Sequence, residues 1–348
     1  MNCWTSFTNK ISFKQEGVTK PWNKRWFGRT FLVWKMERGS EQMDGILPLY
    51  KDRGMTSNDA VMKCRGIFQT RKVGHSGTLD PNVDGVLPIC IGKGTKTVNY
   101  LMQSGKKYRG EVTLGFATTT EDLDGEKVEE TPLKQPFTDD QLQQMMASMM
   151  GEITQIPPMY SAVKVHGKRL YEYARAGEEV ERPQRKVTIK SFKLTAPSEF
   201  DATTGLQKAK FEVECSKGTY VRTLAVDLGK KLGVAAVMSD LTRLESGGFT
   251  LDQTISLAQL QKMKDNGENL QRVLFPVGYA FRKYPQADLT DFQWKIVKNG
   301  GFLQAKYMHT DTPLLVLNYG GKTRALYKYD AVKEVYRPEQ MIDLTEEG

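Results

Sequence analysis

The residues best suited to chemistry lie in one glycine-rich stretch, residues 72–81, with the sequence KVGHSGTLDP. Two glycines flank His75 and Ser76, and Asp80 follows four residues after Ser76 with a proline directly behind it. Glycine permits backbone conformations closed to other residues and lets a ligand come close. A loop of this kind can hold a histidine and a carboxylate at fixed positions facing a groove. Asp80 is therefore predicted to be the reactive group, with His75 helping to present the substrate.

Motifs for several other chemistries are missing from the sequence. It has no G-x-x-x-x-G-K-[ST] phosphate loop, its loop glycines form only half of a dinucleotide pattern, and Ser76 does not lie in G-x-S-x-G. The four cysteines form no C-x-x-C pair and the three histidines are not spaced as ligand pairs, so no metal site is expected. Tyr108 in one basic segment, and Tyr220 with Arg222 in another, remain as candidates beside Asp80.

Each candidate also has a plain structural interpretation. Asp80 with its following proline could simply start a turn, and Arg222 could cap a helix or face solvent. Tyr108 could be a core aromatic, and His75 a hydrogen-bonded loop residue. Basic segments that also carry tyrosines favour RNA over duplex DNA, because unstacked RNA bases lie on aromatic rings while lysines meet phosphates. The net charge of +9 agrees with such an acidic partner.

The first 42 residues differ in composition from the rest of the 348-residue chain. They hold four of the five tryptophans and carry a local net charge of +5, from eight Lys or Arg and three Glu. Without the features of a secretory signal, residues 1–42 are predicted to be a disordered or spurious leader. A large domain over residues 43–280 and a small α/β module over residues 285–348 are predicted to follow. No apolar run approaches the roughly 20 residues of a membrane span, and the cysteine usage fits a reducing setting, so a soluble, cytoplasmic protein is expected.

Apolar periodicity and capping signals place the main elements. Strands are expected over residues 45–50, 85–91, 111–114, 187–189 and 211–215. Ser57 or Asn58 is expected to cap the first helix, and Thr138 with Gln141 three residues later forms a predicted capping box. Pro88 favours an edge or bulge for its strand. Because strands and helices mix without regular βαβ alternation, the predicted class is α+β, with a central mixed but mostly antiparallel sheet flanked by helices.

Several segments together resemble one protein family. VGHSGTLDP at 73–81, followed by GVLP at 85–88, resembles the signature of the TruB family of tRNA pseudouridine synthases. The segments KYR, IPPMYSAVK, KGTYVRTL and LTRL fit further family motifs in the right order, at residues 107–109, 156–164, 217–224 and 241–244. The resemblance covers about residues 43–260. One departure is Asp52, where the family usually has proline.

The resemblance implies the pseudouridine-synthase fold and isomerisation of uridine to pseudouridine at position 55 in the T loop of tRNA. The target base must be flipped out of the folded RNA, the glycosidic bond broken, and C5 rejoined to the ribose. The resemblance implies no cofactor or metal, and the aspartate can attack either the base or ribose C1′. A stand-alone monomer without an obligate protein partner fits this chain better than the guide-RNA-dependent branch of the family. The alternative is a non-catalytic tRNA-binding or folding factor.

Roles for single residues follow from the same resemblance. Asp80 matches the catalytic aspartate, Arg222 the arginine that pairs with it, and Tyr108 the tyrosine that stacks on the target base and takes part in proton transfer. A two-point guanidinium–carboxylate pair is expected to keep Asp80 charged. Residues 285–348 stand where the family carries a PUA-like RNA-binding domain. The residues expected to contact RNA are His75 against displaced nucleotides, Tyr220 and Leu241 as pocket walls, and Lys51, Lys107 and Lys164 as phosphate contacts.

Overall fold

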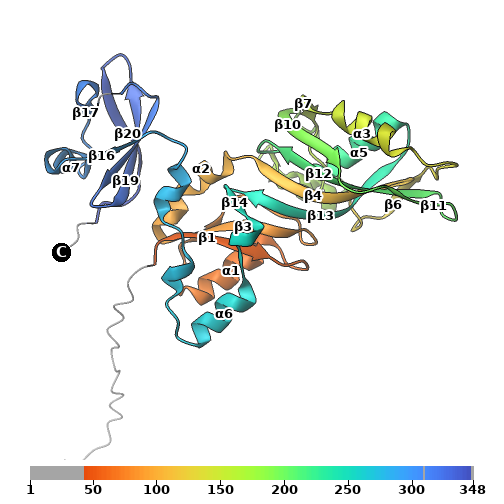
Figure 1. Cartoon of the computed structure of the whole chain (residues 1–348), viewed down its shortest axis with the longest axis horizontal. Helices are drawn as coiled ribbons and strands as arrows, with labels where there is room; N and C mark the ends of the chain where they lie inside the picture. The colour runs from red at the N-terminus through yellow and green to blue at the C-terminus, as the bar shows by residue number, and fades with distance from the viewer. Residues whose placement is uncertain (1–42, 309, 346–348) are drawn as a thin grey trace, which may run out of the picture. The chain divides into compact units, whose positions relative to one another are not determined.

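The computed structural model describes residues 43–308 and 310–345, and the predicted leader over residues 1–42 lies outside these ranges. Figure 1 shows a large sheet with helices packed against it and, in blue, a smaller sheet near the C-terminus. The expected α+β class is confirmed, since strands and helices mix along the chain without a regular alternation. Within the described ranges, no helix is long and apolar enough to cross a membrane.

The large sheet has eleven strands. They are β1 (Gly45–Lys51), β2 (Val73–His75), β3 (Asp84–Ile91), β4 (Lys106–Leu114), β7 (Gly151–Gln155), β10 (Arg185–Leu194), β11 (Glu199–Asp201), β12 (Leu206–Cys215), β13 (Ala236–Ser246), β14 (Phe249–Thr250) and β15 (Ile255–Ser256). The main path runs β15–β1–β3–β13–β4–β12–β10–β7. In this sheet, β1 pairs in parallel with β15 and β3 in parallel with β13, and the other strand pairs of the sheet are antiparallel. The predicted mixed, mostly antiparallel sheet is confirmed.

Four longer helices bury apolar side chains in one core with this sheet. They are α1 (Ser57–Ile67), α3 (Asp139–Ala147), α5 (Val221–Leu232) and α6 (Leu257–Asp265). Shorter elements connect the parts: α2 (Val98–Met102), α4 (Leu170–Ala176), the hairpins β5 (Phe116–Thr118) with β6 (Lys127–Glu130) and β8 (Lys164–Val165) with β9 (Lys168–Arg169), and 3₁₀ turns at Gly92–Thr97, Leu251–Gln253, Leu270–Val273 and Val277–Phe281. The predicted capping box of Thr138 and Gln141 is confirmed at the start of α3.

Helix α1 is capped one residue earlier than the sequence predicted. Thr56 is the N-cap: its hydroxyl accepts from the Asp59 N–H, and the Asp59 carboxylate accepts from the Thr56 N–H. The assignment of Ser57 or Asn58 as the cap is therefore wrong. Ser57 is buried instead, and its hydroxyl donates to the carbonyl of Leu79 at 3.1 Å and accepts from the Leu79 N–H at 2.8 Å. The first turn of α1 thus holds the residue directly before Asp80.

Strand β3 lies inside the sheet, between β1 and β13, so the edge position predicted from Pro88 is wrong. Pro88 stands directly opposite Pro48 of β1 in the antiparallel register. Its carbonyl accepts from the backbone N–H of Ser76 at 3.0 Å, on the side away from β1. The two prolines, which both lack a backbone N–H, therefore face each other, so the hydrogen bonds between β1 and β3 are interrupted at one position only.

The C-terminal part has its own sheet and core. Its strands are β16 (Gln286–Asp288), β17 (Leu303–Gln304), β18 (Leu314–Tyr319), β19 (Lys322–Asp330) and β20 (Val335–Met341), with α7 (Asp291–Val297) and a 3₁₀ turn at Ala305–Tyr307. Trp294, Tyr327 and Tyr336 are buried among its apolar residues. That this part is a PUA-like RNA-binding module stays a prediction.

Candidate active site

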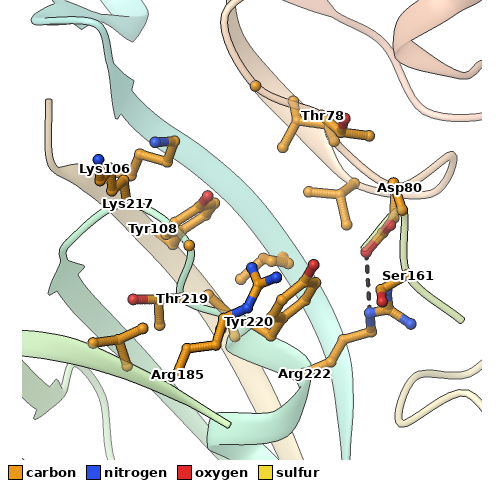
Figure 2. A pocket seen from close by; sticks show the side chains of 18 of the residues that line it. Thr78, Asp80, Lys106, Tyr108, Ser161, Arg185, Lys217, Thr219, Tyr220 and Arg222 are labelled. Carbon is orange, nitrogen blue, oxygen red and sulfur yellow. Dashed lines mark ion pairs between the residues drawn. The ribbon is translucent and has the colours of Figure 1, made fainter. Parts of the chain in front are cut away.

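Five of the predicted residues line one cavity of about 510 Å³: Asp80, Tyr108, Tyr220, Arg222 and Leu241. They come from segments far apart in the sequence, namely the glycine-rich loop, strands β4 and β13, and the turn that leads from β12 into α5 (Figure 2). The volume is in the range of small-ligand sites. The fold thus places the proposed carboxylate, its arginine, two tyrosines and an apolar wall around one space.

Lys51, at the end of β1, holds the loop that carries Asp80 in place. Its side chain is 0% exposed, and its ammonium donates to three backbone carbonyls, those of Asp52 at 2.9 Å, Met55 at 2.8 Å and Pro81 at 3.0 Å. All three ammonium protons therefore have acceptors inside the protein. The prediction that Lys51 contacts a phosphate is corrected, because a buried ammonium with a full set of partners has no face to offer to RNA. Burial lowers the pKa of Lys51 to about 8.

Arg243 of β13 is a second buried cation that holds the same loop. Its side chain is 0% exposed, and Nε donates to the carbonyl of Val86 at 2.7 Å. Nη1 donates to the carbonyl of Thr78 at 3.2 Å and Nη2 to that of Gly77 at 3.3 Å. Gly77 has φ of +124°, a conformation that favours glycine. Arg243 therefore ties the backbone just before Asp80 to the central strands.

Arg222, in the first turn of α5, joins Asp80 to two further segments. Its Nε lies 3.1 Å from Oδ2 of Asp80, the contact drawn in Figure 2. Nη1 donates to the carbonyl of Thr120 at 2.8 Å, and Nη2 to that of Tyr160 at 2.9 Å. The predicted two-point pair with Asp80 is therefore wrong, because two of the three guanidinium nitrogens bind backbone oxygens. Asp122, which the sequence did not single out, adds a carboxylate 3.5 Å from Nη1.

The Asp80 carboxylate faces the cavity, with 40% of its side chain exposed. Burial raises its pKa, Arg222 opposes that change, and the neighbouring Asp122 and Asp124 add to it, so the pKa lies above its ordinary value. A carboxylate with a perturbed pKa and a specific cation partner, lying in a recess, is typical of a functional group. The simple turn interpretation of Asp80 does not account for this arrangement.

Strand β4 sends alternate side chains to opposite faces of the sheet. Tyr108 is buried and lines the cavity, where burial raises its pKa and the charge of Arg243 opposes the rise. Lys106, two residues earlier, lines the cavity as well. Lys107 lies between them and pairs with Glu212 at 2.8 Å, outside the cavity lining. The Lys107 side chain is partly exposed, so its predicted phosphate contact stays an expectation, and Lys106 is the cavity lysine of β4.

The backbone of Tyr220 is held by one buried amide. Gln155 accepts from the Tyr220 N–H at 3.0 Å and donates to the Tyr220 carbonyl at 3.1 Å. The Gln155 side chain is almost completely buried at the end of β7. This two-way contact fixes the turn before α5 and presents the ring of Tyr220 to the cavity, as Figure 2 shows. The sequence carried no signal for Gln155, which lies more than sixty residues away.

Two further predicted RNA contacts, like Lys51 and Lys107, lie outside the cavity lining. His75, on β2, is half-buried, and burial lowers the pKa of its imidazole, so the ring is neutral at pH 7. A neutral ring suits a wedge against displaced bases better than a general acid. Lys164, on β8, is exposed and lines a separate, shallower hollow together with Arg182. Both residues keep their predicted RNA contacts as expectations.

Among the cavity residues that were not singled out from the sequence are Lys106, Ser161, Arg185 and Lys217. Ser161 is 6% exposed and its hydroxyl has no hydrogen-bond partner among the described residues. Alternation along β4 from Tyr108 would have indicated Lys106. Arg185 merely begins a strand, and nothing in the sequence indicates that it lies beside Tyr220. In the described part of the chain, no group of His, Cys, Asp and Glu is arranged to hold a metal ion.

Two family models match the chain. The model described as TruB family pseudouridylate synthase, N-terminal domain, matches residues 65–221, and the tRNA pseudouridylate synthase B C-terminal domain matches residues 222–282. The protein named tRNA pseudouridine synthase B from Ligilactobacillus salivarius is 59% identical over 303 residues, which are 87% of this chain and all of that protein. The protein of the same name from Levilactobacillus brevis is 58% identical over 86% of this chain and 99% of its own length.

Solved structures share the fold at lower identity. A Cbf5–Nop10–Gar1 complex contains a chain with a TM-score of 0.62 and 24% identity, covering 88% of this chain and 84% of its own. An H/ACA RNP bound to a substrate RNA containing 2′-deoxyuridine contains another with a TM-score of 0.62 and 22% identity, covering 86% and 85%. The pseudouridine-synthase fold is therefore confirmed. By its family models and by relatives that match it over most of their length, the chain belongs to the TruB family of pseudouridylate synthases.

Proposed function

We propose that this protein isomerises uridine to pseudouridine in tRNA, at position 55 of the T loop. The observation that carries the proposal is the Asp80 carboxylate, held 3.1 Å from Arg222 in a cavity walled by Tyr108 and Leu241. The relatives' name, tRNA pseudouridine synthase B, supports the choice of substrate. The T-loop position follows from the resemblance of the motifs around Asp80 and is part of the proposal.

The chemistry requires an ionised carboxylate beside the ribose and base. Asp80 attacks either ribose C1′ or the uracil ring; in both routes C1′ exchanges its bond to N1 for a bond to C5, C5 loses a proton and N1 gains one. Arg222 stabilises the charged form of the Asp80 carboxylate and so opposes the burial that raises its pKa. Tyr108 provides a ring for the base to stack on and a phenol that can take part in the proton transfer.

A target base inside a folded RNA loop cannot reach Asp80, so it must be flipped into the cavity. Extrusion costs a few kcal/mol, which stacking against aromatic side chains helps to offset. In this proposal the neutral His75 ring packs against the nucleotides of the RNA T loop that the flipped base leaves displaced. The C-terminal module contacts the rest of the tRNA. The enzyme acts as a monomer, without cofactor or protein partner.

The test is incubation of an unmodified tRNA transcript with the protein alone, followed by mass mapping of pseudouridine. Asp80→Asn removes the ionisable carboxylate and keeps the side-chain shape, so it should abolish product. Affinity for tRNA should stay within about tenfold, or ~1.4 kcal/mol. Asp140→Asn is the matched control, since Asp140 is an exposed residue of α3.

The outcomes separate the two functions considered from the sequence. Product formed by Asp80→Asn would disprove the aspartate mechanism. Tight tRNA binding by the unaltered protein without any product would favour the non-catalytic binding or folding factor.

A further inference from the structure

The end of the cavity away from the ion pair between Asp80 and Arg222 is lined by cations. Lys106 begins β4, Lys217 lies in the turn after β12, and Arg185 begins β10. Figure 2 shows Lys106 and Lys217 side by side, with Arg185 reaching into the cavity next to Tyr220. Asp80 is the only carboxylate among the residues that line this cavity, and it faces Arg222.

These three cations differ in their acidic partners from several lysines close to them in the sheet. Lysines on the neighbouring strand positions have close acidic partners: Lys107 with Glu212 at 2.8 Å, Lys186 with Glu152 at 2.8 Å, and Lys190 with Glu214 at 2.7 Å. Within the described ranges, Lys106, Arg185 and Lys217 make no ion pair, and Lys217 donates only to the amide oxygen of Gln103. The three cations that line the cavity therefore lack the acidic partner that these lysines have, and their charges are available to a ligand.

The cations also repel one another. Burial lowers the pKa of Lys106 to about 8, and the charges of Arg243 and Lys217 act in the same direction. A nearby anion would favour the charged ammonium and return its pKa toward the ordinary value. The positive charge at this end of the cavity is thus uncompensated until an anion binds.

We propose that Lys106, Arg185 and Lys217 form a binding subsite for one backbone phosphate that flanks the flipped nucleotide. The inference rests on the proposed function, because a uridine placed with C1′ at Asp80 brings its own phosphodiester into the rest of the cavity. The phosphate fixes the nucleotide along the cavity while Tyr108 and Leu241 hold the base. Such a contact positions the substrate and carries no base specificity.

The first test replaces single phosphates by neutral methylphosphonates around the target uridine of a T-arm stem–loop. Affinity is measured in the Asp80→Asn background, so that no product forms. One linkage should weaken binding by about tenfold, and Lys106→Met should weaken the unsubstituted RNA by a similar factor. Together the two changes should cost little more than either alone, because both remove the same contact.

Lys190→Met is the matched control, since this exposed lysine lies on the strand of Arg185 and pairs with Glu214. It should stay within about twofold of the parent in affinity and keep the parent's sensitivity to the linkage. Arg185→Gln gives an independent measurement if Lys106→Met fails to fold. Either cavity variant should reduce the salt slope of log Kd by about 0.7 to 0.9 per lost phosphate contact.

A second readout is the pH dependence of affinity. The Lys106 ammonium must be protonated to bind phosphate, so affinity should fall as pH rises above about 8, by at most about tenfold per pH unit. Lys106→Met should lack this component.

Full additivity at every linkage, or unchanged affinity and salt slope in both Lys106→Met and Arg185→Gln, would overturn the subsite. The proposed function is read separately, from pseudouridine formed by the unaltered protein on the unsubstituted RNA. A protein that shows the phosphate coupling but makes no pseudouridine would disprove the function and retain the subsite.

Discussion

The two ends of the cavity differ in how many of their polar groups already have partners. At the Asp80 end, all three guanidinium nitrogens of Arg222 contact an oxygen at 2.8 to 3.1 Å. The loop before Asp80 is held by Ser57 and Arg243 as well. At the other end, Lys106 and Arg185 line the same cavity without an ion pair among the described residues.

This difference indicates that the Asp80 end stabilises charge during the reaction and that the other end binds the substrate. Groups that stabilise charge during a reaction are effective when their positions are fixed beforehand, so that nothing has to reorganise as the reaction proceeds. Groups that bind a substrate can lack a partner in the free protein, because the substrate provides that partner. Substitutions at the networked end should therefore lower kcat, and those at the open end should raise Kd or KM.

The largest effect after loss of Asp80 itself is expected for Arg222→Lys. A single ammonium cannot span Asp80 and the two backbone carbonyls that the guanidinium contacts, so the carboxylate loses its fixed position. We expect kcat to fall by about 100-fold or more, with KM changed far less. Because Arg222 lowers the pKa of Asp80, the acid limb of the kcat/KM profile should also move to higher pH.

Arg53→Lys is the control for Arg222→Lys, since Arg53 also places Nε 3.1 Å from an aspartate oxygen, that of Asp84, but outside the cavity. Its kcat should remain within about threefold of the parent, because the pair lies outside the cavity and the Arg53 side chain is about half exposed. Equal losses in the two variants would mean that the Asp80 pair is merely structural.

Arg243→Met tests whether the loop before Asp80 must be held from the sheet. Loss of hydrogen bonds to Gly77 and Thr78 should let the loop shift, which lowers kcat by about 10- to 100-fold while KM changes little. Arg324→Met is the control, because Arg324 is a buried arginine that binds the backbone carbonyl of Tyr319 in the C-terminal module. Both variants should lower thermal stability, and only Arg243→Met should lower kcat. An equal loss of kcat in both variants would contradict the proposal that Arg243 positions the loop before Asp80.

The same contrast explains what the sequence could predict. Asp80, Tyr108 and Arg222 lie in motifs that resemble a family, and the fold places all three at one cavity. Capping and alternation gave the main elements because those signals are local. Lys51 and Lys106 show the limit: both are lysines in basic segments, yet one is buried against three carbonyls and the other lines the cavity. The Lys51 ammonium binds the carbonyls of Asp52, Met55 and, thirty residues away, Pro81, and the residue pattern does not show these contacts.

Ser161→Ala should have the smallest effect and tests a group that lies at the Asp80 end but has no described hydrogen-bond partner. The Ser161 hydroxyl is buried in the cavity lining without a partner among the described residues, so its partner is expected to be the substrate. Its removal should lower kcat/KM by about 3- to 10-fold, the worth of one hydrogen bond, without lowering stability.

Ser246 provides the control for Ser161, because its hydroxyl is also buried and without a described partner but lies outside the cavity. Ser246→Ala should leave kcat/KM unchanged, and melting temperatures of both variants should match or exceed that of the parent. A loss of stability in Ser161→Ala would show that the hydroxyl serves the fold, and an unchanged kcat/KM would show that the substrate does not use it. If the expected result is found, the Asp80 end also contains a group that is completed only by the substrate, and the contrast between the two ends becomes one of degree.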